Sequence, residues 1–252
     1  MPSAEDGRTP LVVPPLAARR HIMGLTFRNV LGIAAGVDRT GENLQSLITF
    51  GCGHIEIGTV TDPADLRITA RVRAAAGIVG LNVGSARPGF SELVAADYMS
   101  ALFATLRWAD YVVLNFSNTA SERALTAGEA CPILSAARAV IDGHALHGRR
   151  LPLLAKVNAG RAGDPLPISE IAGRILDGFV VSGESTERLS VIRRAFPRHG
   201  LISVGGIRNE SDVQCRMAAG ADLVQSHRAA VENEGAALSV ILRGLQKVAS
   251  DA

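Results

Sequence analysis

The sequence is poor in aromatic residues and has no marked excess of charge of either sign. Phenylalanine, tryptophan and tyrosine make up 4% of the 252 residues, and 26 lysines and arginines balance 24 aspartates and glutamates. A protein dedicated to nucleic acids usually carries a basic excess, and one that binds single strands adds aromatic stacking surfaces. The composition therefore argues against a nucleic-acid partner.

Cysteine is scarce, and long apolar runs are absent. Cys52, Cys131 and Cys215 lie far apart in the sequence, which excludes a disulfide framework and a C-x-x-C metal site. No apolar run approaches the ~18 residues that a membrane-spanning helix needs. The first 20 residues are broken by prolines and lack the apolar region of a signal peptide. We therefore expect a cytoplasmic protein with no membrane-spanning segment.

Several common chemical motifs are also missing. The sequence contains no G-x-G-x-x-G, no Walker A motif and no G-x-S-x-G nucleophile elbow. The six histidines are scattered, and none has the i, i+4 spacing of a metal-ligand pair on a helix. No metal site is predicted.

Short aliphatic and β-branched runs alternate with alanine-rich amphipathic stretches over most of the chain. Eight runs have the near-continuous apolar character of strands buried on both faces of a parallel sheet. These predicted strands are 31–35, 54–60, 78–83, 111–116, 151–157, 178–182, 201–204 and 222–226. Helices are predicted at 41–50, 91–107, 130–144, 168–176, 184–196, 210–219 and 234–249. The alternation predicts an α/β fold of the (β/α)8 TIM-barrel type.

The length suits one barrel domain over residues 1–252, because α/β barrels of this size are commonly single domains. We expect an irregular lead over about the first 25 residues. The interval 61–77 is too short for a full helix with two loops. The crossover between the second and third predicted strands is therefore expected to be shortened.

Polar residues and glycines follow the predicted strands, and the C-terminal end of the strands is the working face of a TIM barrel. Lys156 ends an otherwise apolar strand, where a lysine is costly unless it has a partner, which favours a functional role. Gly205 and Gly206 occupy the usual phosphate position after the seventh strand, or form a tight turn only. Asn82 and Asn115 close two strands, where they either face a ligand or cap the following turns.

Seven segments resemble, in order, those of the dihydroorotate dehydrogenase family. They are LGIAAGVDRTGE, GCGHIEIGTVT, VGLNVGSA, ADYVVLNFSNT, LPLLAKV, SVGGI and AGADLVQ. The resemblance extends over about residues 27–235 and is greater to the membrane-associated, quinone-using class. It implies an FMN-binding TIM barrel of pyrimidine biosynthesis, which oxidises dihydroorotate to orotate by hydride transfer to the flavin.

The resemblance also implies a set of cofactor-binding residues at the ends of the strands. The residues that would bind FMN are Ala35, Gly36, Thr59, Asn82, Asn115, Lys156, Ser182, Gly205, Gly206, His227 and Arg228. The two asparagines and the lysine would contact the isoalloxazine ring, and the glycine pair would hold the phosphate. The last two residues replace a tyrosine and a hydroxyl residue of the family, and as charged groups they would still hold a phosphate.

The substrate side departs further from the family. The family's substrate lysine is Arg39 here, which replaces a compact ammonium group with a planar guanidinium. The family's N-R-M-G-F-N-N loop has no counterpart, and its N-x-S-S-P-N catalytic loop is shortened to NFSN. Ser117 is the predicted catalytic base, and Arg39 and Asn118 are the predicted substrate-binding residues. Each lost buried hydrogen-bond partner costs ~1–3 kcal/mol, so the sequence favours another small ring or unsaturated acid over dihydroorotate.

Two other functional classes are compatible with the residues. One is a catalytically silent barrel that binds flavin or another phosphate ligand and has a structural or regulatory role. The other is a non-redox isomerase or lyase that acts on a phosphorylated substrate. In each case the partner is a small molecule, and a homo-oligomer is compatible with the sequence; the electron acceptor of an oxidoreductase is not specified by it.

Overall fold

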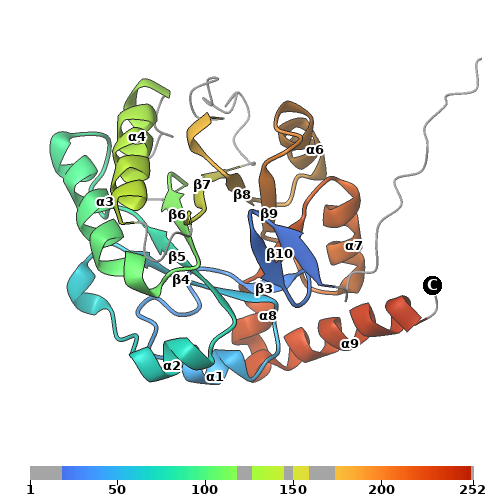
Figure 1. The fold of residues 1–252 in the computed structure, drawn as a ribbon. Coiled ribbons are helices and arrows are strands. Elements are labelled where there is room, and N and C mark those ends of the chain that lie inside the picture. Colours follow the sequence, from blue (N-terminus) through green and yellow to red (C-terminus); the bar gives the residue numbers. More distant parts are fainter. Residues whose placement is uncertain (1–18, 118–126, 145–149, 159–173, 251–252) are drawn as a thin grey trace, which may run out of the picture.

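The computed structural model describes residues 19–117, 127–144, 150–158 and 174–250, and these form a parallel barrel surrounded by helices (Figure 1). The eight barrel strands close in the order β10-β3-β4-β5-β6-β7-β8-β9. Their bounds are β3 (Leu31–Ile33), β4 (His54–Val60), β5 (Ile78–Val83), β6 (Tyr111–Asn115), β7 (Leu153–Asn158), β8 (Gly178–Ser182), β9 (Gly200–Val204) and β10 (Leu223–Ser226). Each predicted strand is present within two residues of its expected ends, so the TIM-barrel prediction is confirmed.

Helices lie outside the barrel, and in sequence they follow individual strands, with α8 and α9 after the last strand. They are α1 (Leu44–Ile48), α2 (Ala70–Ala75), α3 (Glu92–Thr105), α4 (Ala127–Gly143), α6 (Thr186–Ala195), α7 (Glu210–Ala218), α8 (Arg228–Val231) and α9 (Ala236–Ser250). In Figure 1, α3 and α4 lie on one side of the barrel and α6 and α7 on the other. Between β4 and β5 there is only a 3-10 turn (Pro63–Asp65) and the short α2, which confirms the shortened crossover. The expected helix 168–176 lies mostly outside the described residues.

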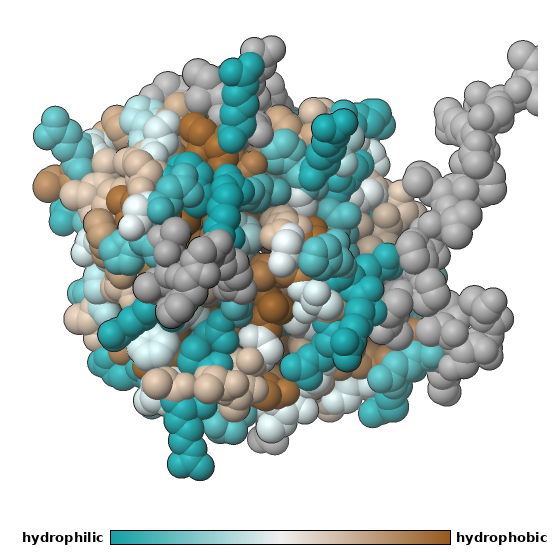
Figure 2. All heavy atoms as spheres, in the orientation of Figure 1, coloured by the Kyte–Doolittle hydropathy of each residue, from teal (hydrophilic) through white to brown (hydrophobic). Residues whose placement is uncertain are grey.

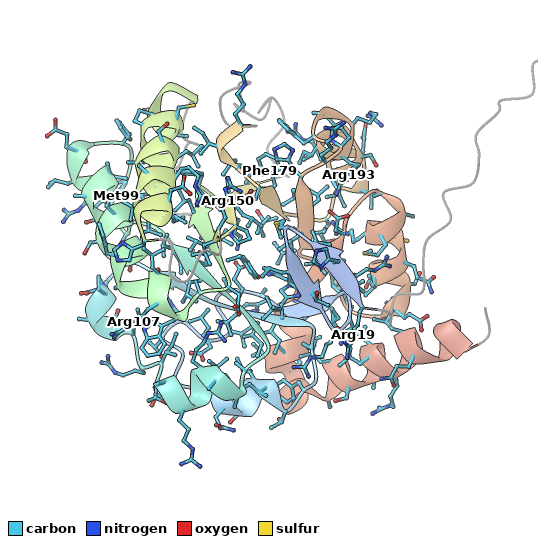
Figure 3. All side chains as sticks on the ribbon, viewed as in Figure 1. Arg19, Met99, Arg107, Arg150, Phe179 and Arg193 are labelled. Carbon is cyan, nitrogen blue, oxygen red and sulfur yellow. The ribbon has the colours of Figure 1, made fainter. Side chains whose placement is uncertain are left out.

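The surface mixes hydrophilic and apolar groups, and the large apolar side chains are mostly inside. Hydrophilic residues spread over most of the face shown in Figure 2, with apolar atoms between them. Of the residues labelled in Figure 3, Arg19 and Arg107 are exposed, whereas Phe179 is fully buried. Met99 lies where α3 approaches α4 and packs against the core. The apolar side chains of the strands are thus buried in the barrel wall.

A β-hairpin precedes the barrel, which corrects the expected irregular lead where the structure describes it. Strands β1 (Arg20–Ile22) and β2 (Leu25–Phe27) pair antiparallel. Met23 and Gly24 between them both have positive φ, 55° and 74°, as a two-residue hairpin turn requires. Three-residue strands are too short to show a reliable alternation in sequence. Leu25 and Phe27 are buried, and the ring of Phe27 meets the ring of His54 edge-on at 5.5 Å between centroids.

The inside of the barrel contains two titratable side chains from β4. His54 is 1% and Glu56 0% exposed. Close glycines make room for the large rings: a Cβ on Gly32 would lie 2.2 Å from the His54 ring, and one on Gly80 would lie 2.2 Å from the ring of Tyr111. Among the described residues, neither ring nitrogen of His54 has a hydrogen-bond partner, and burial lowers the pKa of His54 from 6.5 to about 3.

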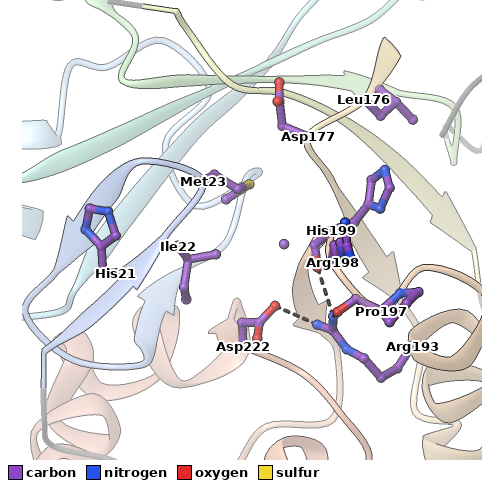
Figure 4. A pocket seen from close by; sticks show the side chains of 11 residues that line it. His21, Ile22, Met23, Leu176, Asp177, Arg193, Pro197, Arg198, His199 and Asp222 are labelled. Atoms are coloured by element: carbon purple, nitrogen blue, oxygen red, sulfur yellow. Dashed lines mark hydrogen bonds and ion pairs between the residues drawn. The ribbon is translucent and has the colours of Figure 1, made fainter. Parts of the chain in front are cut away.

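Three aspartates join neighbouring strands at the N-terminal end of the barrel. Each one immediately precedes a strand and accepts a hydrogen bond from a backbone N–H of the strand before it. The donor and acceptor pairs are Val79 and Asp110 at 2.9 Å, Leu153 and Asp177 at 2.9 Å, and Leu201 and Asp222 at 2.8 Å. An arginine from an outer helix reaches each carboxylate, as Arg193 of α6 does with Asp222 at 2.6 Å (Figure 4). These contacts order the N-terminal end, away from the face where TIM barrels work.

The buried His54 predicts a pH-dependent stability. The unfolded chain binds a proton on this side chain near pH 6.5, whereas the folded chain does so only near pH 3. The free energy of unfolding therefore falls as the pH drops through this window, by up to ~1.4 kcal/mol per pH unit. His54→Leu should make the dependence shallower, measured by urea unfolding between pH 7 and pH 4. His21→Leu, at an exposed ring, is the control, and an unchanged slope in His54→Leu would refute the assignment.

Candidate functional site

Polar side chains from three adjacent strands meet at the C-terminal end of the barrel. The hydroxyl of Thr59 on β4 donates to Asn82 Oδ1 on β5 at 2.7 Å, and Asn115 Nδ2 on β6 donates to the Thr59 hydroxyl at 2.7 Å. The parallel register of β4, β5 and β6 brings the three together. The structure thus unites three of the residues that the sequence singled out. Asn82 bonds to side chains inside the barrel, which argues against a simple capping role.

Below these residues lies a polar cluster that the sequence reasoning missed. Asn82 Nδ2 donates to Glu56 Oε1 at 2.8 Å, and Gln225 Nε2 donates to Glu56 Oε2 at 2.8 Å. The hydroxyl of Tyr111 donates to the same Oε2 at 3.3 Å. Burial, followed by the charge of Glu56, raises the pKa of Tyr111 well above its ordinary value. The signal was present, because Glu56 interrupts the apolar run HIEIGTV as Lys156 interrupts its own.

Ser117 lies just beyond β6 and is held by the asparagine two residues before it. Its hydroxyl donates to Asn115 Oδ1 at 2.9 Å, and its backbone N–H donates to the same oxygen at 3.1 Å. The hydroxyl of Tyr98 donates to the backbone carbonyl of Asn115 at 2.6 Å. Asn115 therefore both stabilises the turn and joins the polar group inside the mouth. The predicted substrate residue Asn118 lies outside the described residues.

Lys156 stands beside Asn115 at the end of β7, since the two residues are register partners in the parallel pair β6–β7. Its side chain is half-buried, and no hydrogen bond or ion pair joins it to another side chain in the part of the chain that the structure describes. One strand further on, Ser182 donates its hydroxyl to the carbonyl of Val157 at 3.0 Å. The cation thus has no fixed carboxylate among the described residues, whereas the serine hydrogen is bound to backbone.

A glycine-lined cavity of about 220 Å³ lies at the ends of β9 and β10. Its lining residues are Glu184, Gly205, Gly206, Ile207, Arg208, Ser226, His227 and Arg228. Gly205 and Gly206 have φ of 110° and 68°, a conformation that favours glycine. A Cβ on Gly206 would lie 2.9 Å from the side chain of Glu184. The cavity brings together the four residues predicted to bind the phosphate.

Arg216 of α7 supports this cavity from behind, and sequence reasoning did not find it. Its guanidinium donates to the carbonyl oxygens of Gly183 at 2.8 Å and Gly205 at 3.0 Å, and its residue is 5% exposed. Burial lowers the pKa of Arg216, and nearby carboxylates oppose this effect. Because its partners are backbone carbonyls on two different loops, no local sequence pattern marks it.

The loop after β3 lies between the two parts of the site. Gly36 donates its N–H to the carbonyl of Gly58 at 2.6 Å, and a Cβ on it would lie 3.4 Å from the ring of His227. Ala35, beside it, is half-buried. The buried Asp38 anchors the loop by accepting three backbone N–H bonds. Arg39, the predicted substrate residue, is exposed at this loop.

Larger cavities lie at the opposite end of the barrel. One of about 480 Å³, shown in Figure 4, is lined by the hairpin and by residues around β8, β9 and β10, including Met23, Arg193 and Asp222. Another, of about 760 Å³, adjoins it. The polar side chains there already have partners: Asp177 and Asp222 accept backbone N–H bonds from neighbouring strands, and Arg193 pairs with Asp222. The smaller cavity at the mouth has the glycines and the polar residues, and is the better candidate for a cofactor site.

Comparison with known proteins agrees with this geometry. No family model matches the sequence. A dihydroorotate dehydrogenase (quinone) of Stenotrophomonas maltophilia (strain K279a) is 29% identical over 310 aligned residues, which cover 96% of this chain and 88% of the relative. Another, of Alkalilimnicola ehrlichii, is 31% identical over 82% of this chain and 79% of the relative. The chain belongs to the dihydroorotate dehydrogenase family. It is accordingly an oxidoreductase by family.

Solved structures extend the likeness to the fold. A dihydroorotate dehydrogenase of Eimeria tenella, determined in complex with ferulenol, has a TM-score of 0.77 at 18% identity over 96% of this chain and 86% of its own. The 310-position alignment to the Stenotrophomonas maltophilia enzyme is longer than the 252 residues of this chain, so that relative carries segments which this chain lacks. None of the described helices is both long and apolar enough to cross a membrane.

Proposed function

We propose that this chain is an FMN-dependent oxidoreductase that oxidises a small ring acid of the dihydroorotate type. The observation that carries the proposal is the joined set of Thr59, Asn82 and Asn115 beside Lys156, with a glycine-lined cavity at the same end of the barrel. FMN, when bound, would supply the hydride acceptor. The chain's own residues would bind the cofactor, orient the substrate and accept its proton.

The cavity at β9 and β10 fits a phosphate monoester. Positive-φ glycines leave room for an anion to approach the backbone N–H groups, and Arg208, His227 and Arg228 line the same space. Glu184 opposes this charge in part, but its carboxylate is engaged by Arg208 at 3.2 Å. We therefore assign the phosphate end of FMN to this cavity.

The ring end of the flavin would lie at Asn82, Asn115 and Lys156. Lys156 would place a positive charge against the electron-rich ring system, and each amide would supply the one N–H that its bonds within the chain leave over. Ala35, Gly36, Thr59 and Ser182 are the further proposed contacts, at the same end of the barrel. Such a polar rim on an apolar barrel suits a planar polar ligand.

Ser117 is the proposed base. Its half-buried position leaves its oxygen accessible for a proton taken from the substrate, and its own hydrogen, now directed at Asn115 Oδ1, would then have to pass to solvent, because an amide oxygen is not a base. A serine is a weak base without a relay to solvent or a neighbour. Arg39 is the proposed substrate cation, and Asn118 the proposed substrate amide. The relatives are named for dihydroorotate, and neither they nor the described residues support the expected preference for another acid.

Flavin content and flavin reduction test this function. We expect the purified protein to bind FMN and show oxidised-flavin absorbance, and the flavin to be bleached by dihydroorotate or a related acid without oxygen. A short-chain quinone, the acceptor in the relatives' name, is the first acceptor to test. Binding without reduction by any acid tested would favour a silent flavin barrel. A protein that binds no FMN would favour a non-redox barrel enzyme.

Removing the positive charge of Lys156 at the barrel mouth should weaken FMN binding. Lys156→Ala is expected to lower FMN affinity about 10- to 100-fold, since hydrogen bonds to charged groups contribute ~1.5–3 kcal/mol. Titration of the apoprotein by flavin fluorescence measures this. Arg198→Ala, which removes an exposed cation at the opposite end of the barrel, is the matched control. Equal affinity in Lys156→Ala and wild type would rule out the assignment.

Removing the proposed base should affect the chemistry and spare the cofactor. Ser117→Ala is expected to slow flavin reduction by the substrate about 10²- to 10⁴-fold, the usual general-base contribution, with FMN affinity unchanged. Anaerobic rapid mixing measures the rate. Ser190→Ala, whose hydroxyl bonds to the carbonyl of Ala219 outside the site, is the control. An unchanged rate would show that another group is the base, and loss of FMN would show a structural role.

A further inference from the structure

A continuous chain of side-chain hydrogen bonds runs from the inside of the barrel to its mouth. It starts at Glu56 and passes to Asn82 at 2.8 Å, to Thr59 at 2.7 Å, to Asn115 at 2.7 Å and to Ser117 at 2.9 Å. The members come from β4, β5, β6 and the turn that follows β6. A fully buried carboxyl is therefore connected to the proposed base through three intermediate side chains.

The direction of every hydrogen bond in this chain is set by its two ends. A carboxylate only accepts hydrogen bonds, so Asn82 must turn its NH2 group to Glu56 and its oxygen to Thr59. At the other end the backbone N–H of Ser117 only donates, so Asn115 must turn its oxygen to Ser117 and its NH2 group to Thr59. Between these ends the Thr59 hydroxyl can only accept from Asn115 and donate to Asn82.

The orientation of the Gln225 side-chain amide is determined by Glu56. Its NH2 group donates to Glu56 Oε2 at 2.8 Å, while its own oxygen is buried with no hydrogen-bond partner among the described residues. A buried amide oxygen without a partner costs free energy. The amide holds this orientation nonetheless, because the reverse would bring its oxygen against the carboxylate. The contacts of Glu56 with Asn82, Gln225 and Tyr111 are thus all donations to its oxygens.

The outcome at the mouth is a serine with a defined orientation. Asn115 Oδ1 takes both the N–H and the O–H of Ser117, so the hydroxyl hydrogen points to the asparagine. No other described residue bonds to the serine oxygen, so its lone pairs are left for a molecule bound in the mouth. Had Asn115 the opposite orientation, its NH2 group would donate to the serine oxygen and occupy a lone pair.

We propose that Glu56 is a positioning residue that fixes the hydrogen-bond direction of Asn82 and Thr59 and, together with the backbone N–H of Ser117, that of Asn115, and so holds Ser117 oriented to accept. The use of Ser117 as a base rests on the proposed function. The orientation itself needs no flavin, because all of its contacts lie within the chain. It can therefore be tested on the apoprotein.

The first test uses apoprotein in which only the asparagines carry ¹⁵N. In Glu56→Gln an NH2 group competes with the donors around it, so the side-chain amide signals of both Asn82 and Asn115 should shift. Tyr111→Phe removes a donor to Glu56 that is not part of the chain, and should leave Asn115 unmoved. The exchange Glu56→Gln with Gln225→Glu keeps one carboxylate and one amide in the cluster and should restore the Asn115 signal.

A shift of Asn82 alone in Glu56→Gln would overturn the proposal, because Glu56 would then act only on its neighbour. If Glu56→Gln does not fold, Asn82→Ala interrupts the chain one step on, and an unmoved Asn115 signal there would be equally decisive. In FMN-loaded protein, Glu56→Gln should also slow flavin reduction about tenfold, and Tyr111→Phe should not match this loss. Failure of the wild type to bind FMN would refute the proposed function, while the amide signals would still decide the role of Glu56.

Discussion

The barrel depends on filling its interior, because eight parallel strands close only when inward side chains occupy the space along the axis. Here that space holds a carboxyl at its centre. Glu56 from β4 takes hydrogen bonds from β5, β6 and β10, so one side chain ties strands across the barrel. None of the described cations pairs with Glu56, and a buried carboxyl without a cation is stable only with such donors. The large rings nearby in turn require glycine at Gly32 and Gly80.

This central cluster explains why the mouth is polar. Thr59 lies further along β4, which carries Glu56, and Asn115 lies further along β6, which carries Tyr111, and both extend the network outward. The proposed phosphate cavity has a different origin, in glycine turns held by Arg216. The proposed flavin site therefore combines one part built from barrel side chains with another built from loop backbone. Of the proposed substrate-binding residues, Arg39 is exposed and Asn118 lies outside the described residues.

Sequence reasoning found the strands because buried parallel strands are apolar throughout, and it found Lys156 because one charge interrupts such a strand. Glu56 carries the same signal in HIEIGTV and was passed over. Its partner Gln225 is 169 residues away, and such a pairing leaves no local pattern. The β1–β2 hairpin was missed because three-residue strands are too short to register. The resemblance to the family supplied the FMN assignment, which no spacing of residues could have given.

The aspartates at the N-terminal end of the barrel bear on how the chain reaches its fold. Each one closes a pair of consecutive strands, β5 with β6, β7 with β8 and β9 with β10, over separations of 31, 24 and 21 residues. Asn29 does the same for β3 and β4 by accepting from Gly53, 24 residues on. Loop-closure entropy is modest at such distances, and local contacts speed folding. The barrel is thus divisible into four two-stranded units, each able to form its own closing bond before the ring is complete.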